Sequence, residues 1–198
     1  GDVYKRQAWR NMKKMTKDQL NSWRAFYGPR DKAFHEANLS GKELVRWKFQ
    51  RYAKNYLRCV RGVDDSVGKI QDTLKNLKLD DNTVVIYSSD QGFYIGDHGW
   101  YDKRWMYEES LMMPLIVKWP GVTKPDSRSV QMFQNLDYAQ TFLEMAGAEI
   151  PSNMQGRSLV PILKNGKADD WRKSIYYHYY EYPSVHMIPR HYGIRTER

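Results

Sequence analysis

Residues 83–92 have the sequence Thr-Val-Val-Ile-Tyr-Ser-Ser-Asp-Gln-Gly, in which a β-branched run meets polar side chains and a glycine. The run lacks the alternation of a strand with one wet face, so it predicts a strand buried on both faces, as in parallel α/β sheets. A second apolar run at 114–119 predicts a neighbouring strand. The expectation from these residues is therefore an α/β fold.

Apolar periodicity predicts a long helix before this strand. From Leu44 to Leu77, apolar residues recur mostly at three- and four-residue steps, which indicates one amphipathic helix, or two helices with a break near Gly62. Ser40, followed three residues later by Glu43, has capping-box spacing at the start of this pattern.

Four other segments complete the expected organisation. Residues 8–39 contain a Gly-Pro turn signal and predict short helices and loop. Residues 135–147 predict a helix that ends at a glycine, and residues 174–182 and 191–196 predict late strands. The apolar side of the 135–147 helix is expected to consist of Leu136, Ala139, Phe142, Leu143 and Ala146.

The composition is that of a basic globular protein. The chain has 198 residues, and its 32 Lys and Arg against 23 Asp and Glu give a net charge of +9. Residues 1–79 carry +11 and residues 80–198 carry −2. This bias fits a solvated helix face or a polyanion-binding surface, and no nucleic-acid motif accompanies it, so we expect no nucleic-acid partner. No apolar run reaches the roughly 18–20 residues of a membrane span.

The ends and the lone cysteine give further expectations. Residues 1–7 look like a non-native tail translated from a sequencing adapter, and the C-terminus stops inside a strand pattern, so we expect an internal fragment. Cys59 excludes an internal disulfide, and its place in the helix predicts a buried thiol. The sequence leaves the oligomeric state open.

Polar and charged residues gather directly after the predicted strand, between Ser88 and Glu109. In open α/β sheets ligands bind at the carboxyl ends of the strands, so this position suits a site. Asp90 and Gln91 offer a carboxylate beside an amide oxygen, a donor set that suits Ca²⁺ or Mg²⁺ better than Zn²⁺. The alternative is that Asp90 only caps a turn.

Several blocks of sequence, in order and spacing, resemble the sulfatases of the alkaline-phosphatase superfamily. The resemblance implies an alkaline-phosphatase-like sandwich with a mostly parallel or mixed central sheet and part of a small antiparallel C-terminal subdomain. Residues 8–165 would then be the C-terminal part of the catalytic domain, and 166–198 the start of the subdomain. The blocks are Asp81-Asn82-Thr83, Ser89-Asp90-Gln91-Gly92, Gly96-Asp97-His98-Gly99-Trp100, Asp102-Lys103-Arg104, Tyr107-Glu108-Glu109-Ser110, Trp119-Pro120-Gly121 and Gln155-Gly156-Arg157-Ser158-Leu159.

The resemblance also assigns roles to single residues. Asp90 and Gln91 fall on a pair of metal ligands, with Ca²⁺ as the usual metal, and Lys103 falls on a lysine that contacts the sulfate group. His98 lies beside them and is expected either to support the site or touch the substrate, or else to pack within its loop. Asp64, with the aspartate that follows it, lies in the helix and is therefore interpreted as surface charge or helix packing instead of the family's first metal-ligand pair.

The family's nucleophile is not among these residues. It is a Cys or Ser in a C/S-x-P-x-R motif that is oxidised to formylglycine, and Cys59 fails this motif because Val-Arg-Gly-Val follows it. The resemblance therefore implies a Ca²⁺-dependent sulfatase whose nucleophile lies outside this chain. The chain alone is expected to be inactive and, with only two ligands, to bind Ca²⁺ weakly.

The tail suggests the substrate. It is rich in Tyr, and His178, Arg190 and His191 are candidates for binding a sulfated sugar, because Tyr rings stack on sugars and Arg and His bind sulfate or carboxylate. An aromatic sheet that packs on a helix is the alternative, and a metal site from His178, His186 and His191 is a further one. The tail resembles carbohydrate sulfatases, with 6-sulfated N-acetylglucosamine as a candidate substrate.

Two other functions stay open at this point. A phosphodiesterase or phosphonate hydrolase of the same superfamily shares the scaffold, and a non-enzymatic polyanion-binding module could use the basic helix. Sulfatases of this kind work in the periplasm, outside the cell or in lysosomes, so we expect one of these locations.

Overall fold

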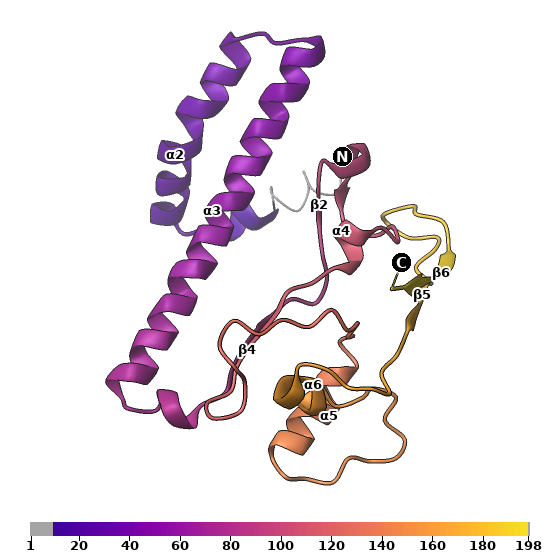
Figure 1. Ribbon diagram of the computed structural model, residues 1–198. Helices are drawn as coiled ribbons and strands as arrows, with labels where there is room; N and C mark the ends of the chain where they lie inside the picture. The colour runs from indigo at the N-terminus through magenta and orange to yellow at the C-terminus, as the bar shows by residue number, and fades with distance from the viewer. Residues whose placement is uncertain (1–9, 198) are drawn as a thin grey trace. The chain divides into compact units, whose positions relative to one another are not determined.

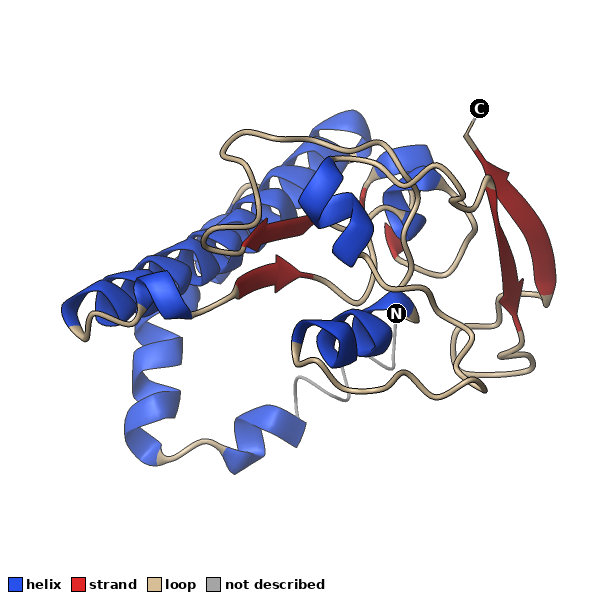
Figure 2. Ribbon diagram, turned by 60° about the horizontal axis from the view of Figure 1, so that its bottom comes forward, coloured by secondary structure: helices blue, strands red, loops and turns tan. Residues whose placement is uncertain are grey.

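The computed structural model describes residues 10–197, so the expected adapter-derived tail at residues 1–7 lies outside the described residues. The chain forms two compact units, which divide between Val60 and Arg61. Helices and strands both occur (Figures 1 and 2), so the expected α/β class is confirmed. Among the described residues, none of the helices combines the length and apolar character that crossing a bilayer requires.

The helix α2 (Lys17–Glu36) corrects the expectation of short helices and loop before residue 40. Thr16 caps it in a reciprocal capping box with Gln19, and the helix continues through Pro29. At the proline, the Arg30 guanidinium donates to the carbonyl of Phe26. The Gly-Pro pair is therefore a position inside the helix and not a turn, because the strong cap upstream and packing against the next helix outweigh the cost of the proline.

The helix α3 (Gly41–Asn76) is a single element of 36 residues that passes Gly62 without a break. Its first half packs antiparallel to α2 (Figure 1), where Phe34 stacks on Trp47 with ring centroids 4.2 Å apart. Cys59 is exposed on this helix, so the expected buried thiol is wrong. The α2 helix covers only one side of α3, and Cys59 lies on a part of α3 that remains open to solvent.

The strand β1 (Val85–Ser88) pairs with β4 (Leu115–Lys118), as the two apolar runs predict. The pairing is antiparallel, with Val85 opposite Lys118, whereas the uninterrupted apolar run had favoured a parallel sheet. The strand is also not buried on both faces. Tyr87 and Ile116 stand opposite each other on one face and are 38% and 65% exposed.

A small aromatic core lies beyond these strands, built around Tyr94, which is 1% exposed. Tyr94 belongs to β2 (Tyr94–Ile95), which pairs with β3 (Tyr101–Asp102) across the turn η2 (Asp97–Gly99). The short helix α4 (Glu108–Leu111) follows. These elements form the segment that carries the expected site residues.

The helix α5 (Asp137–Met145) ends before a glycine with positive φ, as expected, and packs against α6 (Val160–Asn165). Its buried face is polar, and its apolar face is mostly exposed. Asp137 has no exposed surface, whereas Phe142 is 48% exposed. The expected inner side of the helix is therefore reversed within the described residues, because the long-range partners of Asp137 hold the polar side inward.

Asp137 is the centre of a buried ion pair. Both of its oxygens bind the Arg172 guanidinium, with Oδ1 2.6 Å from Nη2. The same carboxylate accepts hydrogen bonds from the backbone N–H groups of Gln134 (2.7 Å) and Arg157 (2.8 Å). Preceding Arg157, Gly156 comes so close that a Cβ there would lie 2.0 Å from the carbonyl oxygen of Leu136.

The late strands are present as an antiparallel hairpin of β5 (Ser174–Tyr179) and β6 (His191–Thr196). One face packs inward, since a Cβ at Gly193 would lie 2.5 Å from the sulfur of Met106. The other face is open, with Tyr176 and Tyr192 61% and 74% exposed. The hairpin thus presents an aromatic surface to solvent.

Candidate active site

Asp90 and Gln91 lie in the loop at the carboxyl end of β1. The side-chain amide of Asn135 donates to the carbonyl of Asp90 (2.8 Å), and Ser89 Oγ donates to the carbonyl of Gln91 (2.8 Å). The backbone of both residues is therefore held in place. The Asp90 carboxylate is exposed, and its Oδ1 has only a long contact of 3.4 Å with Ser89 Oγ, which leaves both oxygens available to a ligand.

Ser110 joins the Asp90 loop to the segment that carries Lys103. Its carbonyl accepts the N–H of Gly92 (2.8 Å), and its hydroxyl donates to the carbonyl of Lys103 (2.6 Å). Gly92 approaches α4 so closely that a Cβ would lie 2.1 Å from the carbonyl oxygen of Glu109, and only glycine permits this approach. The loop and Lys103 are thus both fixed to α4.

Lys103 follows β3 directly. Its neighbours Asp102 and Arg104 pair with each other at 2.9 Å, and within residues 10–197 the Lys103 ammonium has no acidic partner. Beneath the segment, the buried Tyr94 donates to the carbonyl of Trp105 (2.7 Å). Burial raises the pKa of Tyr94, so its hydroxyl stays protonated and keeps this hydrogen bond. Lys103 is therefore a cation on a supported backbone.

His98 lies in η2 with a φ of 57°, a conformation that residues with a side chain seldom adopt. Its ring stacks on Tyr107 with centroids 4.6 Å apart, and its Nε2 lies 3.2 Å from Glu109 Oε2. The side chain is 43% exposed. These contacts orient the imidazole, and its exposure leaves it open to a substrate, so both roles expected from the sequence remain predictions.

Arg104 connects this segment to the chain between β5 and β6. Its Nη2 lies 2.6 Å from Nε2 of His186, and His186 Nδ1 lies 3.6 Å from Asp102 Oδ2. The hydroxyl of Tyr177 donates to the carbonyl of Arg104 (3.3 Å). The residues on both sides of Lys103 are therefore tied to the C-terminal hairpin.

The candidate substrate residues of the tail lie on different faces. His178 stacks on Tyr180 (3.8 Å) on the open face, with its Nδ1 2.8 Å from the hydroxyl of Tyr176. His191 lies on the inner face, where it stacks on Trp105 (5.0 Å) and donates from Nδ1 to a backbone carbonyl. Arg190 donates to the carbonyl of residue 182 (2.9 Å) and is exposed.

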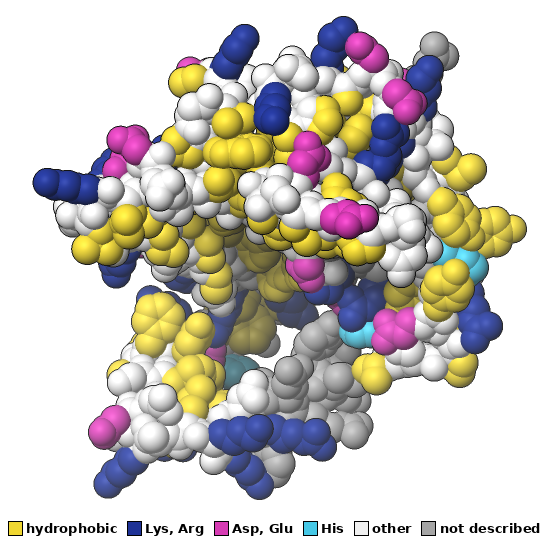
Figure 3. Space-filling view, turned by 90° about the horizontal axis from the view of Figure 1, so that it is seen from below, with side chains coloured by type: hydrophobic (Ala, Val, Ile, Leu, Met, Phe, Trp, Pro, Cys, Tyr) yellow, Lys and Arg dark blue, Asp and Glu magenta, His cyan; other side chains and the backbone are white. Residues whose placement is uncertain are grey.

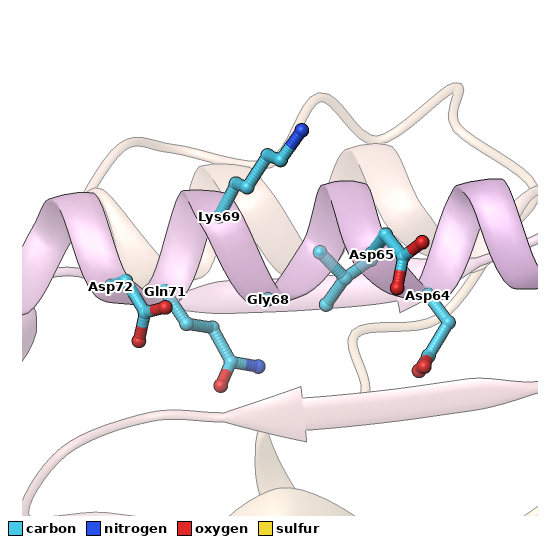
Figure 4. Close-up of a pocket in the computed structure, with 7 residues that line it drawn as sticks. Asp64, Asp65, Gly68, Lys69, Gln71 and Asp72 are labelled. Carbon is cyan, nitrogen blue, oxygen red and sulfur yellow. The ribbon is translucent and has the colours of Figure 1, made fainter.

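The adjacent Asp64 and Asp65 are surface charge, as expected. Asp65 pairs with Arg61 one turn earlier (2.9 Å). The two carboxylates line a hollow along α3 from which Lys69 points away (Figure 4). A solvated ion pair at this spacing is an ordinary feature of a helix surface.

The donor set fits part of a cation site. Within the described residues, no three His, Cys, Asp or Glu side chains form a group that could hold a metal ion, so neither the tail histidines nor Asp64 complete one. Asp90 and Gln91 are two hard oxygen donors on a fixed loop, and they fit as two of the six to eight oxygens that Ca²⁺ takes.

Residues 96–198 match the family model described as "N-sulphoglucosamine sulphohydrolase, C-terminal", which is just over half of the chain. The N-acetylglucosamine-6-O-sulfatase of Bacteroides thetaiotaomicron is 47% identical over 187 residues, covering 93% of this chain and 34% of that protein. The chain belongs to the sulfatase family. The human N-acetylglucosamine-6-sulfatase is 35% identical over 119 residues, covering 59% of this chain and 21% of that protein.

Two solved structures resemble the chain. One, of a protein in complex with its substrate D-glucosamine-2-N,6-O-disulfate, has a TM-score of 0.87 at 46% identity and covers 94% of this chain and 38% of that chain. A phosphonate monoester hydrolase from Silicibacter pomeroyi has a TM-score of 0.55 at 32% identity and covers 59% of this chain and 23% of that chain. The sulfatase chain spans about a third or less of the length of the curated relatives named here.

Sequence reasoning did not find all of the residues that build this part of the sulfatase. Ser110 appeared only as part of a motif, and its role depends on hydrogen bonds to two residues that precede it by 18 and by 7 positions. His186 was considered only as a metal ligand, yet it contacts Arg104 from 82 residues away. No local pattern signals such contacts.

Proposed function

We propose that this chain acts within an enzyme that hydrolyses the sulfate esters of a sulfated carbohydrate. The observation that carries the proposal is that Ser110 hydrogen-bonds to the backbone of two segments. One carries the Asp90 carboxylate, which is open to a cation, and the other carries Lys103, whose ammonium has no acidic partner within residues 10–197. The 47% identity to an N-acetylglucosamine-6-O-sulfatase over 93% of the chain supports the reaction class.

The chemistry follows from the charge of the ester. A sulfate ester is an anion, so its charge must be offset before another oxygen can attack it. Asp90 and Gln91 would hold Ca²⁺ together with ligands outside this chain, and the bound cation would neutralise and orient the ester oxygens. Lys103 would place its ammonium where negative charge gathers during the transfer, a preorganised contact of the kind that lowers a barrier.

The nucleophile in this proposal is a formylglycine outside the chain. The chain alone would then hold no nucleophile and show no turnover. With two protein oxygens it would also bind Ca²⁺ weakly. A calorimetric titration of the chain that gave sub-micromolar Ca²⁺ affinity would contradict this part of the proposal.

The substrate class is proposed from the relatives and the tail. Two of the named relatives are N-acetylglucosamine-6-sulfatases by name, and a similar structure holds D-glucosamine-2-N,6-O-disulfate as its substrate. The open aromatic face beside His178 suits the stacking of a pyranose ring. We therefore name 6-sulfated N-acetylglucosamine as the substrate, with His178, Arg190 and His191 as candidate contacts. We also propose action in the periplasm, outside the cell or in lysosomes, where such glycans occur.

The first test is the gene sequence upstream of codon 8. We expect a C/S-x-P-x-R motif with two adjacent Asp codons before it. A Thr, or a lone Ser without the motif, would overturn the formylglycine mechanism and favour a phosphoryl-transfer enzyme.

The second test uses the full-length protein with matched esters. We expect hydrolysis of N-acetylglucosamine 6-sulfate that a chelator abolishes and Ca²⁺ restores. Asp90→Asn should raise the Ca²⁺ concentration needed for half-maximal activity, whereas Asp97→Asn, an exposed change in the next loop, should leave this concentration unaltered. Faster hydrolysis of a phosphonate monoester than of the sulfate ester would refute the proposed reaction class.

A further inference from the structure

The net charge of the chain is concentrated in one unit. Residues 10–60 hold 13 Lys and Arg against 4 Asp and Glu, a net +9, whereas residues 61–198 hold 17 against 18. Most of these 13 residues lie on α2 and the first half of α3. Figure 3 shows Lys and Arg side chains in dark blue on one face of the molecule, without distinguishing the two units. A charge of this size on about 50 residues creates a local positive potential that attracts anions.

Two guanidinium groups from different helices converge on one exposed ring. The Arg30 guanidinium carbon lies 3.8 Å from the centroid of Phe26, and that of Arg58 lies 5.8 Å from the same centroid. Arg30 also donates to the carbonyl of Phe26, and Arg58 donates to the side-chain oxygen of Asn55 (2.8 Å). Both cations are therefore held in place by α2 and α3 before any ligand arrives.

Lys54 supplies a third cation on the same face of α3 as Arg58. Lys54 precedes Arg58 by one helical turn and so shares its face of α3. Within residues 10–197, no acidic side chain pairs with Arg30, Lys54 or Arg58. The nearby Asp31 is already bound to Arg51 at 2.6 Å. Like charges held together without a counterion repel each other, and an anion bound among them would relieve this repulsion.

We propose that Arg30, Lys54 and Arg58 form a binding site for the anionic groups of a sulfated polysaccharide, separate from the loop that carries Asp90 and Lys103. The inference rests on the proposed function, because a sulfated carbohydrate is the anionic polymer that the enzyme would meet. The site would bind a sulfate or carboxylate that is not being hydrolysed, so that a polymer gains affinity that a single sugar does not. Guanidinium groups suit this task because their planar forks bind two oxygens of a sulfate at once.

The test measures binding to the whole chain and needs no hydrolysis. The probe is a fluorescein-labelled heparin-type oligosaccharide, followed by anisotropy between about 50 and about 200 mM salt. The double variant Arg30→Gln/Arg58→Gln should bind at least about tenfold more weakly, because each lost charge-assisted contact is worth a factor of this order. Its salt dependence should also be shallower, since fewer ions are displaced on binding.

The matched control removes the same charge elsewhere. Lys124→Gln/Arg128→Gln changes two exposed cations of the other unit and should keep the affinity of the parent chain. An equal loss in both double variants would overturn the site, since it would show a general charge effect. If Arg30→Gln/Arg58→Gln does not fold, Lys54→Glu alone gives the same comparison, because its side chain makes no hydrogen bond or ion pair with a described residue.

A single-stranded DNA with the same number of charges tests the choice of ligand. We expect it to bind more weakly than the oligosaccharide, and tighter binding of the DNA would overturn the assignment to a sulfated polysaccharide. Failure here is distinct from failure of the proposed function. Hydrolysis of a monosaccharide sulfate by the full-length protein does not need this site, so it would persist if only the inference were wrong.

Discussion

Replacing Asp137 by Asn should lower the free energy of unfolding more than a substitution at the surface does. The change breaks a buried ion pair while keeping the shape of the side chain. Asp137 has no exposed surface, and its two oxygens accept hydrogen bonds from Arg172 and two backbone N–H groups. An Asn presents an NH₂ group to donors that need an acceptor. The Arg172 guanidinium, only 12% exposed, then loses its counterion.

The size of the effect follows from this burial. Removing one partner of a buried ion pair costs about 3–5 kcal/mol, because the remaining charge is left without solvent or counterion. With a urea dependence of about 2 kcal/mol per molar, the unfolding midpoint should fall by about 1.5–2.5 M. Urea titration of the two proteins, followed by tryptophan fluorescence, measures this shift directly.

The control is Asp169→Asn, the same chemical change at an exposed carboxylate. Asp169 pairs with Lys167 at 3.1 Å, but its side chain is 90% exposed, so the change should cost less than about 1 kcal/mol. Adding Arg172→Met to Asp137→Asn should recover part of the loss, because it removes the orphaned cation. A midpoint shift for Asp137→Asn no larger than that of Asp169→Asn would refute the reasoning.

Three further predictions concern the site and its supports. In the full-length protein, Lys103→Met should lower kcat for the sulfate ester about 10²–10³-fold, and steady-state kinetics with less than a threefold change would contradict its role. Gly92→Ala should destabilise the chain by at least about 1–3 kcal/mol, whereas Gly68→Ala, where a Cβ meets nothing, should stabilise it by up to about 1 kcal/mol in urea titrations. The hydrogen bond from Arg195 holds the pKa of Glu108 below its usual 4.5, so this pair stabilises the fold above about pH 4.5 and the stabilisation is lost as the pH falls further. The stability difference between the parent and Glu108→Gln should therefore shrink on acidification, and a difference that is constant from pH 7 to about pH 3 would rule this out.

The sequence predicted the elements whose signals are local. The apolar runs at 83–87 and 114–119 correspond to paired strands, and the 135–147 helix and both late strands lie where expected. These elements depend on side-chain periodicity and turn residues within a few positions. Such signals survive in a single sequence.

The misses have long-range causes. The buried side of α5 is decided by Arg172, which lies 35 residues from Asp137, and an apolar-face rule cannot include that partner. In α2 the Gly28-Pro29 pair, a strong local breaker, is outweighed by the Thr16 cap and by packing on α3. The antiparallel pairing of β1 likewise depends on how the chain returns, which an unbroken apolar run does not encode.

In the candidate site, too, the sequence predicts the features that depend on local residues and misses those that depend on distant contacts. The position of Asp90 at the end of a strand and the oxygen donors of the 90–91 pair could be found from the residues, and the resemblance to sulfatases supplied Lys103. The support for these groups could not be found, because the partners of Ser110 are backbone groups, the N–H of Gly92 and the carbonyl of Lys103, and not side chains. Backbone partners leave almost no trace in residue type.

The double attachment of Ser110 has a mechanical consequence. Ser110 hydrogen-bonds to the backbone of both the Asp90 loop and the Lys103 segment. A displacement of α4 would therefore move both segments in the same direction. The separation between the two charges is thereby insulated from strain that arises elsewhere in the chain. Mutations that shift α4 as a whole would move both charged groups and keep the distance between them. Loss of the Ser110 hydroxyl would instead let the Asp90 loop and the Lys103 segment move independently.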